Sequence, residues 1–215
     1  MEIENFEKNR FLIQKNLLPL DICRIATKYA LIQENVKFQP EEEITGQVPG
    51  AHSVYGDTLM ETIMFFIKPH IEKLTDLSLS STYTYFRVYR PGQDLKRHKD
   101  RPSCEISTTI CLGYNYAETP TEYNWGMYVD PDSITSENGP NGEFISNNKP
   151  GFMIEQHPGD IIIYRGCELE HWREPLQGNK NTYQVQVFCH FINKNGPFYP
   201  DLVYDGRKGL GYPAI

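Results

Sequence analysis

A series of short strands separated by turn residues occupies residues 82–192 and constrains the fold of this chain most. Runs rich in Tyr, Val, Ile and Thr alternate there with clusters of Gly, Pro and Asn. Many short strands with frequent turn signals indicate a β-sandwich or jelly roll. The expected strands are Thr82–Tyr89, Glu105–Leu112, Trp125–Val129, Gly151–Gln156, Asp160–Tyr164, Glu168–Arg173 and Thr182–Ile192.

The first third of the chain has a different, helical pattern. Residues 21–34 repeat apolar side chains at about helical spacing, directly after Pro19. A second helix is expected from Asp57, a plausible N-cap, and Pro69 should kink or split it. The predicted class is therefore α+β, mostly β with N-terminal helices. With 215 residues, the chain suits one domain: a helical part at 1–80, a β core at 81–193 and an irregular tail at 194–215.

Charge and cysteine content exclude several classes of function. Lys and Arg number 21 against 28 Asp and Glu, which argues against a nucleic-acid partner because such binding needs a basic surface. No apolar run is long enough to cross a membrane, and the N-terminus lacks the apolar centre of a signal peptide. Five cysteines without a Cys-x-x-Cys pair predict neither disulfides nor a zinc site. A cytoplasmic location is expected.

Three residues in two separate segments predict a metal site. His98 and Asp100 are two positions apart, so in an extended segment both side chains point to the same side. His171 lies in a later strand. Two imidazoles and one carboxylate form the facial triad of non-haem iron(II) oxygenases, which leaves the opposite coordination positions open.

The residues around this triad follow a known order. Tyr89-Arg90-Pro91-Gly92 precedes the His-x-Asp pair, Pro158-Gly159-Asp160 opens an apolar strand before His171, and Lys180 follows nine residues after His171. This order resembles the prolyl-4-hydroxylase-like branch of the 2-oxoglutarate- and Fe(II)-dependent dioxygenase superfamily, from Tyr83 to about Asn193. The resemblance implies a double-stranded β-helix of the jelly-roll, cupin-like type, with the N-terminal helices buttressing its major sheet.

The resemblance also implies roles for single residues. His98, Asp100 and His171 would be the iron ligands, with no catalytic residue beyond them. Lys180 would pair with the distal carboxylate of 2-oxoglutarate, and Tyr89 would donate a hydroxyl to the same group. Arg173 competes with Lys180, because it lies two residues beyond His171 and so faces the same interior. An arginine also binds a carboxylate through two parallel hydrogen bonds.

The implied activity is oxidative decarboxylation of 2-oxoglutarate to succinate and CO₂, coupled to hydroxylation of a prime substrate, with Fe(II) and O₂. A protein or peptide side chain is the first expectation for that substrate, and a small molecule is the alternative. Two rival functions are a cupin-like metal enzyme that does not use 2-oxoglutarate and a non-catalytic binding module. In the strand containing Tyr83, Tyr85, Arg87 and Tyr89, one face is polar and aromatic, and it is expected to line the pocket.

Overall fold

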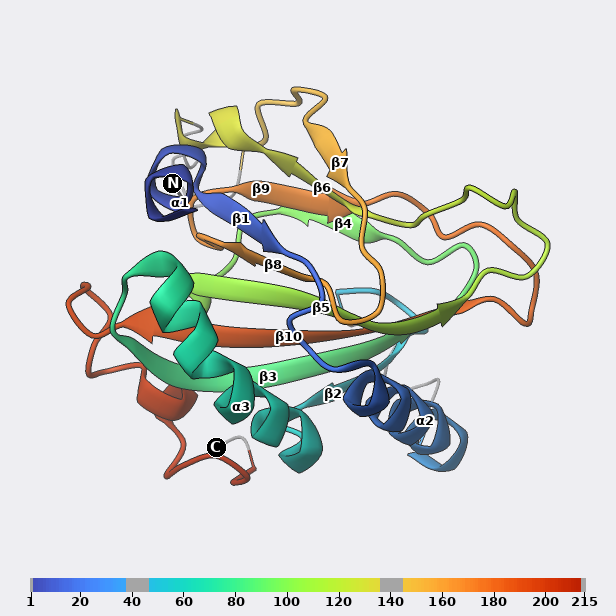
Figure 1. Ribbon diagram of the computed structural model, residues 1–215, viewed down its shortest axis with the longest axis horizontal. Helices are drawn as coiled ribbons and strands as arrows, with labels where there is room; N and C mark the ends of the chain where they lie inside the picture. The colour runs from blue at the N-terminus through green and yellow to red at the C-terminus, as the bar shows by residue number, and fades with distance from the viewer. Residues whose placement is uncertain (1, 38–46, 136–144, 214–215) are drawn as a thin grey trace.

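Two antiparallel sheets form the centre of the computed structural model, which describes residues 2–37, 47–135 and 145–213. Figure 1 shows the larger sheet below the smaller one. The larger sheet has the spatial order β1 (Phe11–Gln14), β8 (Ile161–Tyr164), β5 (Ile106–Asn115), β10 (Tyr183–Asn193), β3 (Leu79–Tyr89) and β2 (His52–Tyr55). The smaller sheet has the order β4 (Leu95–His98), β9 (Glu170–Arg173), β6 (Met127–Asp130) and β7 (Phe152–Ile154).

The two faces of the larger sheet differ in chemistry. Along β3, Phe86 and Val88 belong to the main apolar core, whereas Tyr85 and Arg87 line a cavity on the opposite face. Alternation of this kind follows from the two-residue period of a strand. β10 repeats the pattern, with Val187 in the core and Phe188 in the cavity wall. The larger sheet is therefore buried on both faces, and its polar face is turned towards the smaller sheet.

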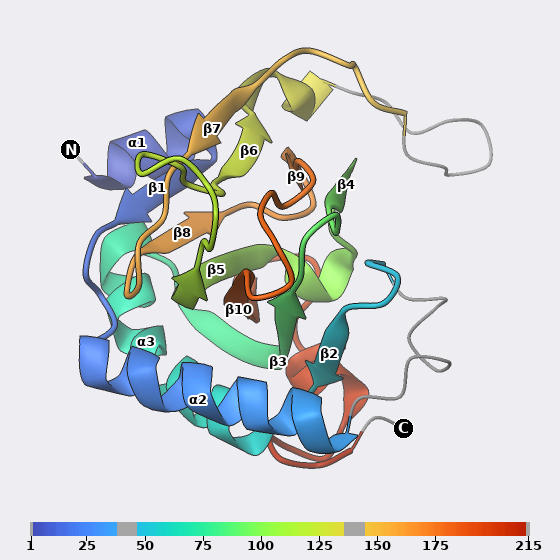
Figure 2. The same cartoon turned by 90° about the vertical axis from the view of Figure 1, so that its right-hand side faces the viewer.

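Helices α2 (Leu20–Lys37) and α3 (Thr58–Thr75) cover the apolar face of the larger sheet (Figures 1 and 2). A shorter helix, α1 (Glu2–Asn9), precedes β1. The side chain of Asp57 caps α3 by accepting hydrogen bonds from the amides of Leu59 and Met60, as an N-cap residue does. No helix in the described part of the chain combines the length and apolar character needed to cross a membrane.

The predicted fold class, mostly β with N-terminal helices, is confirmed, and the differences are local. Of the expected kink or split of the second helix at Pro69, the split is wrong, because α3 runs unbroken from Thr58 to Thr75. Strands β1, β2 and β4 were not expected from the sequence. Each is only four residues long and forms through pairing with a partner strand distant in sequence, so local pattern is a weak guide to it.

The turn Pro158-Gly159-Asp160 fastens the N-terminal segment to the sheet. Asp160 is 2 % exposed. Its carboxylate accepts hydrogen bonds from Lys15 Nζ at 2.9 Å, from the Asn16 amide at 3.1 Å and from the His157 amide at 2.9 Å. Gly159 has a φ of +92°, and a Cβ there would lie 2.5 Å from the carbonyl oxygen of Leu18. The motif thus has a structural reason in this chain, since it joins β8 to the segment between β1 and α2.

Replacing Asp160 with Asn should lower the free energy of unfolding by about 1.5–3 kcal/mol, because hydrogen bonds and an ion pair to a buried charge are lost. Burial raises the pKa of Asp160, but Lys15 and the two amides outweigh it and hold the pKa below its usual value. The stabilisation is therefore complete above the unfolded-state pKa of about 3.9 and is lost as the pH falls through the lower folded-state pKa.

Urea unfolding of the wild-type protein and of Asp160→Asn between pH 7 and pH 2.5 measures the difference in their free energies of unfolding. Asp21→Asn is the control, because Asp21 forms an exposed ion pair with Arg24 and its loss should cost less than about 1 kcal/mol. Equal destabilisation by the two substitutions would contradict the role given to Asp160.

Candidate metal centre

The pairing of β4 with β9 places the two histidines of the predicted triad face to face. His98 lies directly opposite His171 in this antiparallel register, and their ring centroids are 4.3 Å apart. Arg97, adjacent to His98, forms ion pairs with Asp130 of β6 and Glu170 of β9. Since successive side chains of a strand point to opposite faces, this ion-pair cluster holds β4 in place from the side away from the histidines.

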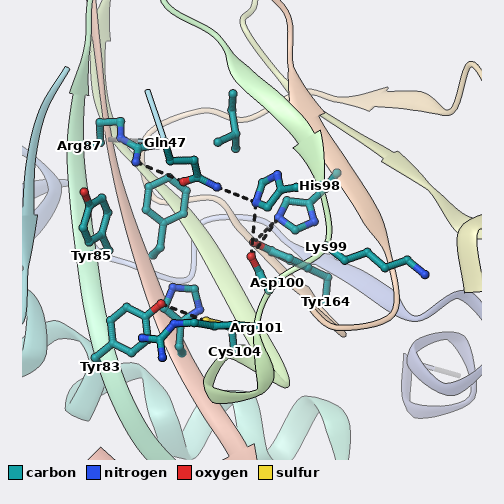
Figure 3. A pocket seen from close by; sticks show the side chains of 14 residues that line it. Gln47, Tyr83, Tyr85, Arg87, His98, Lys99, Asp100, Arg101, Cys104 and Tyr164 are labelled. Carbon is teal, nitrogen blue, oxygen red and sulfur yellow. Dashed lines mark hydrogen bonds and ion pairs between the residues drawn. The ribbon is translucent and has the colours of Figure 1, made fainter. Parts of the chain in front are cut away.

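Asp100 completes the group immediately after β4 ends. Its amide donates to the carbonyl of Gly166 at 2.9 Å, and its Oδ2 accepts a hydrogen bond from Ser107 Oγ at 2.7 Å. Its Oδ1 lies 3.4 Å from His98 Nε2 and 3.6 Å from His171 Nε2. Figure 3 shows the carboxylate and the imidazole of His98 directed towards each other. Three side chains from two segments therefore converge on one point.

The donor atoms of this group fit a divalent metal ion. His98 Nδ1 lies 2.7 Å from the carbonyl of Lys96, and His171 Nδ1 lies 3.0 Å from the carbonyl of Leu169. Each Nδ1 therefore donates to a carbonyl, and each Nε2 is the nitrogen that faces Asp100 and can bind a metal when it carries no proton. One ligand atom from each of the three residues lies within 4.8 Å of the others.

Asp100 is ionised in this environment. Burial raises its pKa, but the neighbouring His171 and His98 more than offset this effect and hold the pKa well below its usual value. Two neutral imidazole nitrogens and one carboxylate are the donors that iron(II) takes in a facial triad.

A second group of potential ligands, Asp100, Cys104 and His190, shares the same carboxylate. Burial raises the pKa of the Cys104 thiol well above its usual value, so it lacks the thiolate that binds a metal. Burial also lowers the pKa of His190 to about 4, and its Nδ1 lies 2.9 Å from Ser107 Oγ. Ser107 therefore connects His190 to Asp100, and this second group serves to position the carboxylate.

A cavity of about 360 Å³ opens beside the triad. This volume lies in the range of small-molecule sites. The polar and aromatic face of β3 lines the pocket through Tyr83, Tyr85 and Arg87, as expected, whereas Tyr89 of the same face is not part of the wall (Figure 3). Besides the triad, the wall includes Tyr83, Tyr85 and Arg87 of β3, Tyr164 of β8, and Phe188 and His190 of β10.

Gln47 connects the triad to Arg87 across this cavity (Figure 3). Its Nε2 lies 2.9 Å from His98 Nε2, and its Oε1 accepts a hydrogen bond from Arg87 at 3.3 Å. Because the amide uses the lone pair of His98 that a metal would need, metal binding requires the Gln47 side chain to move. Gln47 is exposed, so its side chain has room to do so.

The three residues predicted to hold the cosubstrate lie in different surroundings. Lys180 is exposed on the turn between β9 and β10. Arg173 is 1 % exposed and donates to the Trp125 carbonyl at 2.7 Å and to Gln156 Oε1 at 2.6 Å. Tyr89 is fully buried, and its hydroxyl accepts a hydrogen bond from Arg87 at 2.9 Å. The structure thus places Arg173 and Tyr89 inside the molecule and Lys180 outside it.

Three further polar residues of the site were not singled out from the sequence: Gln47, Ser107 and Tyr164. Tyr164 ends the apolar run Ile161–Ile163, which is a readable signal for a buried position. Gln47 and Ser107 carry no such signal, because contacts with residues far away in the sequence define their role.

Replacing Gly166 with Ala should weaken metal binding at least about tenfold. A Cβ at this position would overlap both Asp100 Oδ2 and the carbonyl oxygen of Cys104 and would lie 2.7 Å from Ser107 Oγ, so the carboxylate and the backbone beside it must shift. Loss of support around a ligand typically costs about 10–100-fold in metal affinity. Anaerobic titration with Fe(II), or with Mn(II) as a spectroscopic probe, measures the effect.

Gly209→Ala is the matched control, because a Cβ there would meet only Tyr212 side-chain atoms at ordinary distances of 3.7–3.8 Å. Unchanged metal affinity in the Gly166 variant would show that Asp100 does not bind the ion.

Comparison with known proteins identifies the fold. No protein-family model and no curated protein sequence matches the chain. Among solved structures, a Pseudomonas putida prolyl-4-hydroxylase matches with a TM-score of 0.59 and 15 % identity, over 89 % of this chain and 96 % of that one. The epimerase SnoN in complex with Fe³⁺, α-ketoglutarate and nogalamycin RO matches with a TM-score of 0.68 and 10 % identity, over 99 % and 91 %.

A third match is a Trichoplax adhaerens prolyl hydroxylase in complex with a peptide of hypoxia inducible factor, with a TM-score of 0.58 and 13 % identity, over 89 % and 87 % of the two chains. All three belong to one structural class, in which two antiparallel sheets form a double-stranded β-helix. The chain therefore has the double-stranded β-helix fold of the 2-oxoglutarate- and iron-dependent oxygenases, the prolyl-4-hydroxylases among them.

Proposed function

We propose that this protein is a 2-oxoglutarate- and Fe(II)-dependent dioxygenase that hydroxylates a prime substrate. The convergence of His98, Asp100 and His171 on one point beside a cavity is the observation that carries the proposal. A fold shared with iron- and α-ketoglutarate-binding proteins supports it. When bound, iron and 2-oxoglutarate supply the oxidising chemistry: dioxygen is consumed, 2-oxoglutarate is decarboxylated to succinate and CO₂, and a C–H bond of the prime substrate is hydroxylated.

The residues of the chain orient and protect this chemistry. The Lys96 and Leu169 carbonyls hold the imidazoles of His98 and His171 with Nε2 facing the metal position. Ser107 holds one oxygen of Asp100, which leaves the other oxygen directed at the histidines. Because these ligands are fixed before the metal binds, they need little reorganisation when it does, although the Gln47 side chain has to move aside.

Arg173 is the best partner for the distal carboxylate of 2-oxoglutarate. It lies two residues beyond His171 on the same face of β9, which is roughly 7 Å along a strand. A five-carbon dicarboxylate bound to the metal at one end can span that distance. Burial lowers the pKa of Arg173, and its Nε has no hydrogen-bond partner among the described residues. Tyr89 lies nearby, with its ring against Trp125, whose carbonyl Arg173 also contacts.

The two rival functions receive less support from the site. A cupin-like enzyme without 2-oxoglutarate typically uses more histidine ligands, and in the described part of the cavity wall the one further histidine is His190, which Ser107 engages. A binding module without catalysis has no need of three convergent metal donors. We therefore favour the oxygenase.

Purified protein kept free of oxygen should bind one Fe(II) per chain, and addition of 2-oxoglutarate should then produce a weak visible charge-transfer band. Asp100→Ala should lose both the iron and the band, because one of three ligands is gone. On exposure to oxygen, the wild-type protein should release succinate in an iron-dependent manner. Iron binding without any effect of 2-oxoglutarate on the spectrum would favour the cupin-like rival instead.

Arg173→Gln should raise the Kd for 2-oxoglutarate by about tenfold or more, because a buried charge-assisted contact is typically worth about 1.5–3 kcal/mol. Lys180→Ala should leave this Kd unchanged, since Lys180 is exposed on a turn. Titration of the charge-transfer band measures both values. The opposite result, a large effect of Lys180→Ala with none of Arg173→Gln, would reassign the carboxylate partner to Lys180.

A further inference from the structure

Two arginines inside the molecule have no acidic partner among the described residues. Arg87 and Arg173 are each 1 % exposed, and no carboxylate of the described residues lies within 4.0 Å of either guanidinium. Every other arginine of the chain pairs with a carboxylate within that distance. Arg207 is also buried, at 5 % exposed, and it pairs with Glu61 at 2.6 Å. An unpaired buried cation is costly, so the two exceptions call for an explanation.

Within the described part of the chain, the contacts of Arg87 are all with neutral groups. Its Nε donates to Ser53 Oγ at 2.9 Å, its Nη1 to the Tyr89 hydroxyl at 2.9 Å and its Nη2 to Gln47 Oε1 at 3.3 Å. The rings of Tyr85 and Phe188 lie within 6 Å of the guanidinium carbon. These contacts fix the direction of the guanidinium and leave its charge uncompensated.

The cosubstrate can neutralise only one of these two arginines. This step rests on the function proposed above. One carboxylate of 2-oxoglutarate and Asp100 together balance the two charges of iron(II), and the second carboxylate pairs with one arginine. Whichever arginine takes it, the charge of the other arginine keeps no acidic partner among the described residues. A further anion is therefore expected at this site, and within the reaction only the prime substrate remains to bring it.

We propose that Arg87 binds a carboxylate of the prime substrate and that this substrate is a small carboxylic acid. Arg87 lines the cavity next to the triad, whereas Arg173 is not part of its wall. Gln47 supports the assignment, because its amide oxygen already occupies a position on Arg87 that a carboxylate oxygen would take. Once the metal has moved the Gln47 side chain away from His98, the substrate acid would take the place of this amide oxygen on Arg87.

The rest of the cavity fits this class of ligand. Tyr83, Tyr85 and Phe188 give it aromatic walls, which suit an apolar body attached to the carboxylate. Arg101, the other arginine in the wall, is already paired with Asp205 at 2.7 Å and so does not compete for the acid. A volume of about 360 Å³, which 2-oxoglutarate would share, suits a prime substrate that is small.

The test uses the anaerobic protein loaded with Fe(II) and saturating 2-oxoglutarate. Calorimetry measures the binding of a series of monocarboxylates from acetate to benzoate, each compared with its uncharged amide. At least one acid should bind at one site per chain, and its amide should bind at least about tenfold more weakly than the acid. In Arg87→Gln the affinity for that acid should fall by about tenfold or more, while the Kd for 2-oxoglutarate stays within about threefold of the wild-type value.

Arg24→Gln is the matched control, because Arg24 is exposed and forms a local ion pair with Asp21. Should Arg87→Gln fail to fold, the comparison of acid and amide in the wild-type protein decides alone. The inference is overturned when no acid binds, when acid and amide bind equally, or when Arg87→Gln weakens 2-oxoglutarate rather than the acid. Absence of metal-dependent 2-oxoglutarate binding in the wild-type protein contradicts the proposed function instead, whatever the acids do.

Discussion

The antiparallel pairing of β4 with β9 is the constraint on which the candidate site depends. It places His98 opposite His171, and the chain reaches Asp100 only two residues later. The ion pairs of Arg97 with Asp130 and Glu170 secure the pairing from the far side of the smaller sheet. A slip of one residue would turn every side chain of β4 to the other face, so this register is the physical basis of the site.

The larger sheet serves the site through its two unlike faces. Its apolar face is buried under α2 and α3, which fixes the orientation of each strand. Its other face can then hold polar groups inside the molecule, whereas a fold with a single apolar core would exclude them. Ser107 and Tyr164 approach the triad from this face, and Arg87 presents a positive charge beside it. The fold thus permits charges in the interior that are costly until a ligand compensates them.

Much of the fold and of the candidate site could be predicted from the sequence, because the relevant sequence signals are local. The alternation of Tyr83, Tyr85 and Arg87 gives the inward face of β3, and the spacing of His98 and Asp100 gives two side chains on one side of a strand. The position of Arg173, two residues beyond His171, correctly indicated a buried arginine on the inward face of β9.

The remaining features depend on contacts between distant segments. Whether Lys180 points inward depends on the turn before β10, and the sequence does not encode that direction in any periodicity. Gln47 reaches His98 across 51 residues, and Asp205 reaches Arg101 across 104 residues. The unpaired charge of Arg87 becomes visible only when the ion pairs of the described residues are compared with one another. No pattern within a single segment contains that information.

The central claim is that His98, Asp100 and His171 bind one metal ion together. A crystal structure of the iron-loaded protein, with anomalous diffraction recorded at the iron absorption edge, tests it most directly. The account predicts a single anomalous peak at bonding distance from both Nε2 atoms and from a carboxylate oxygen of Asp100. An iron peak elsewhere in the molecule, or one that contacts fewer than these three side chains, would contradict it.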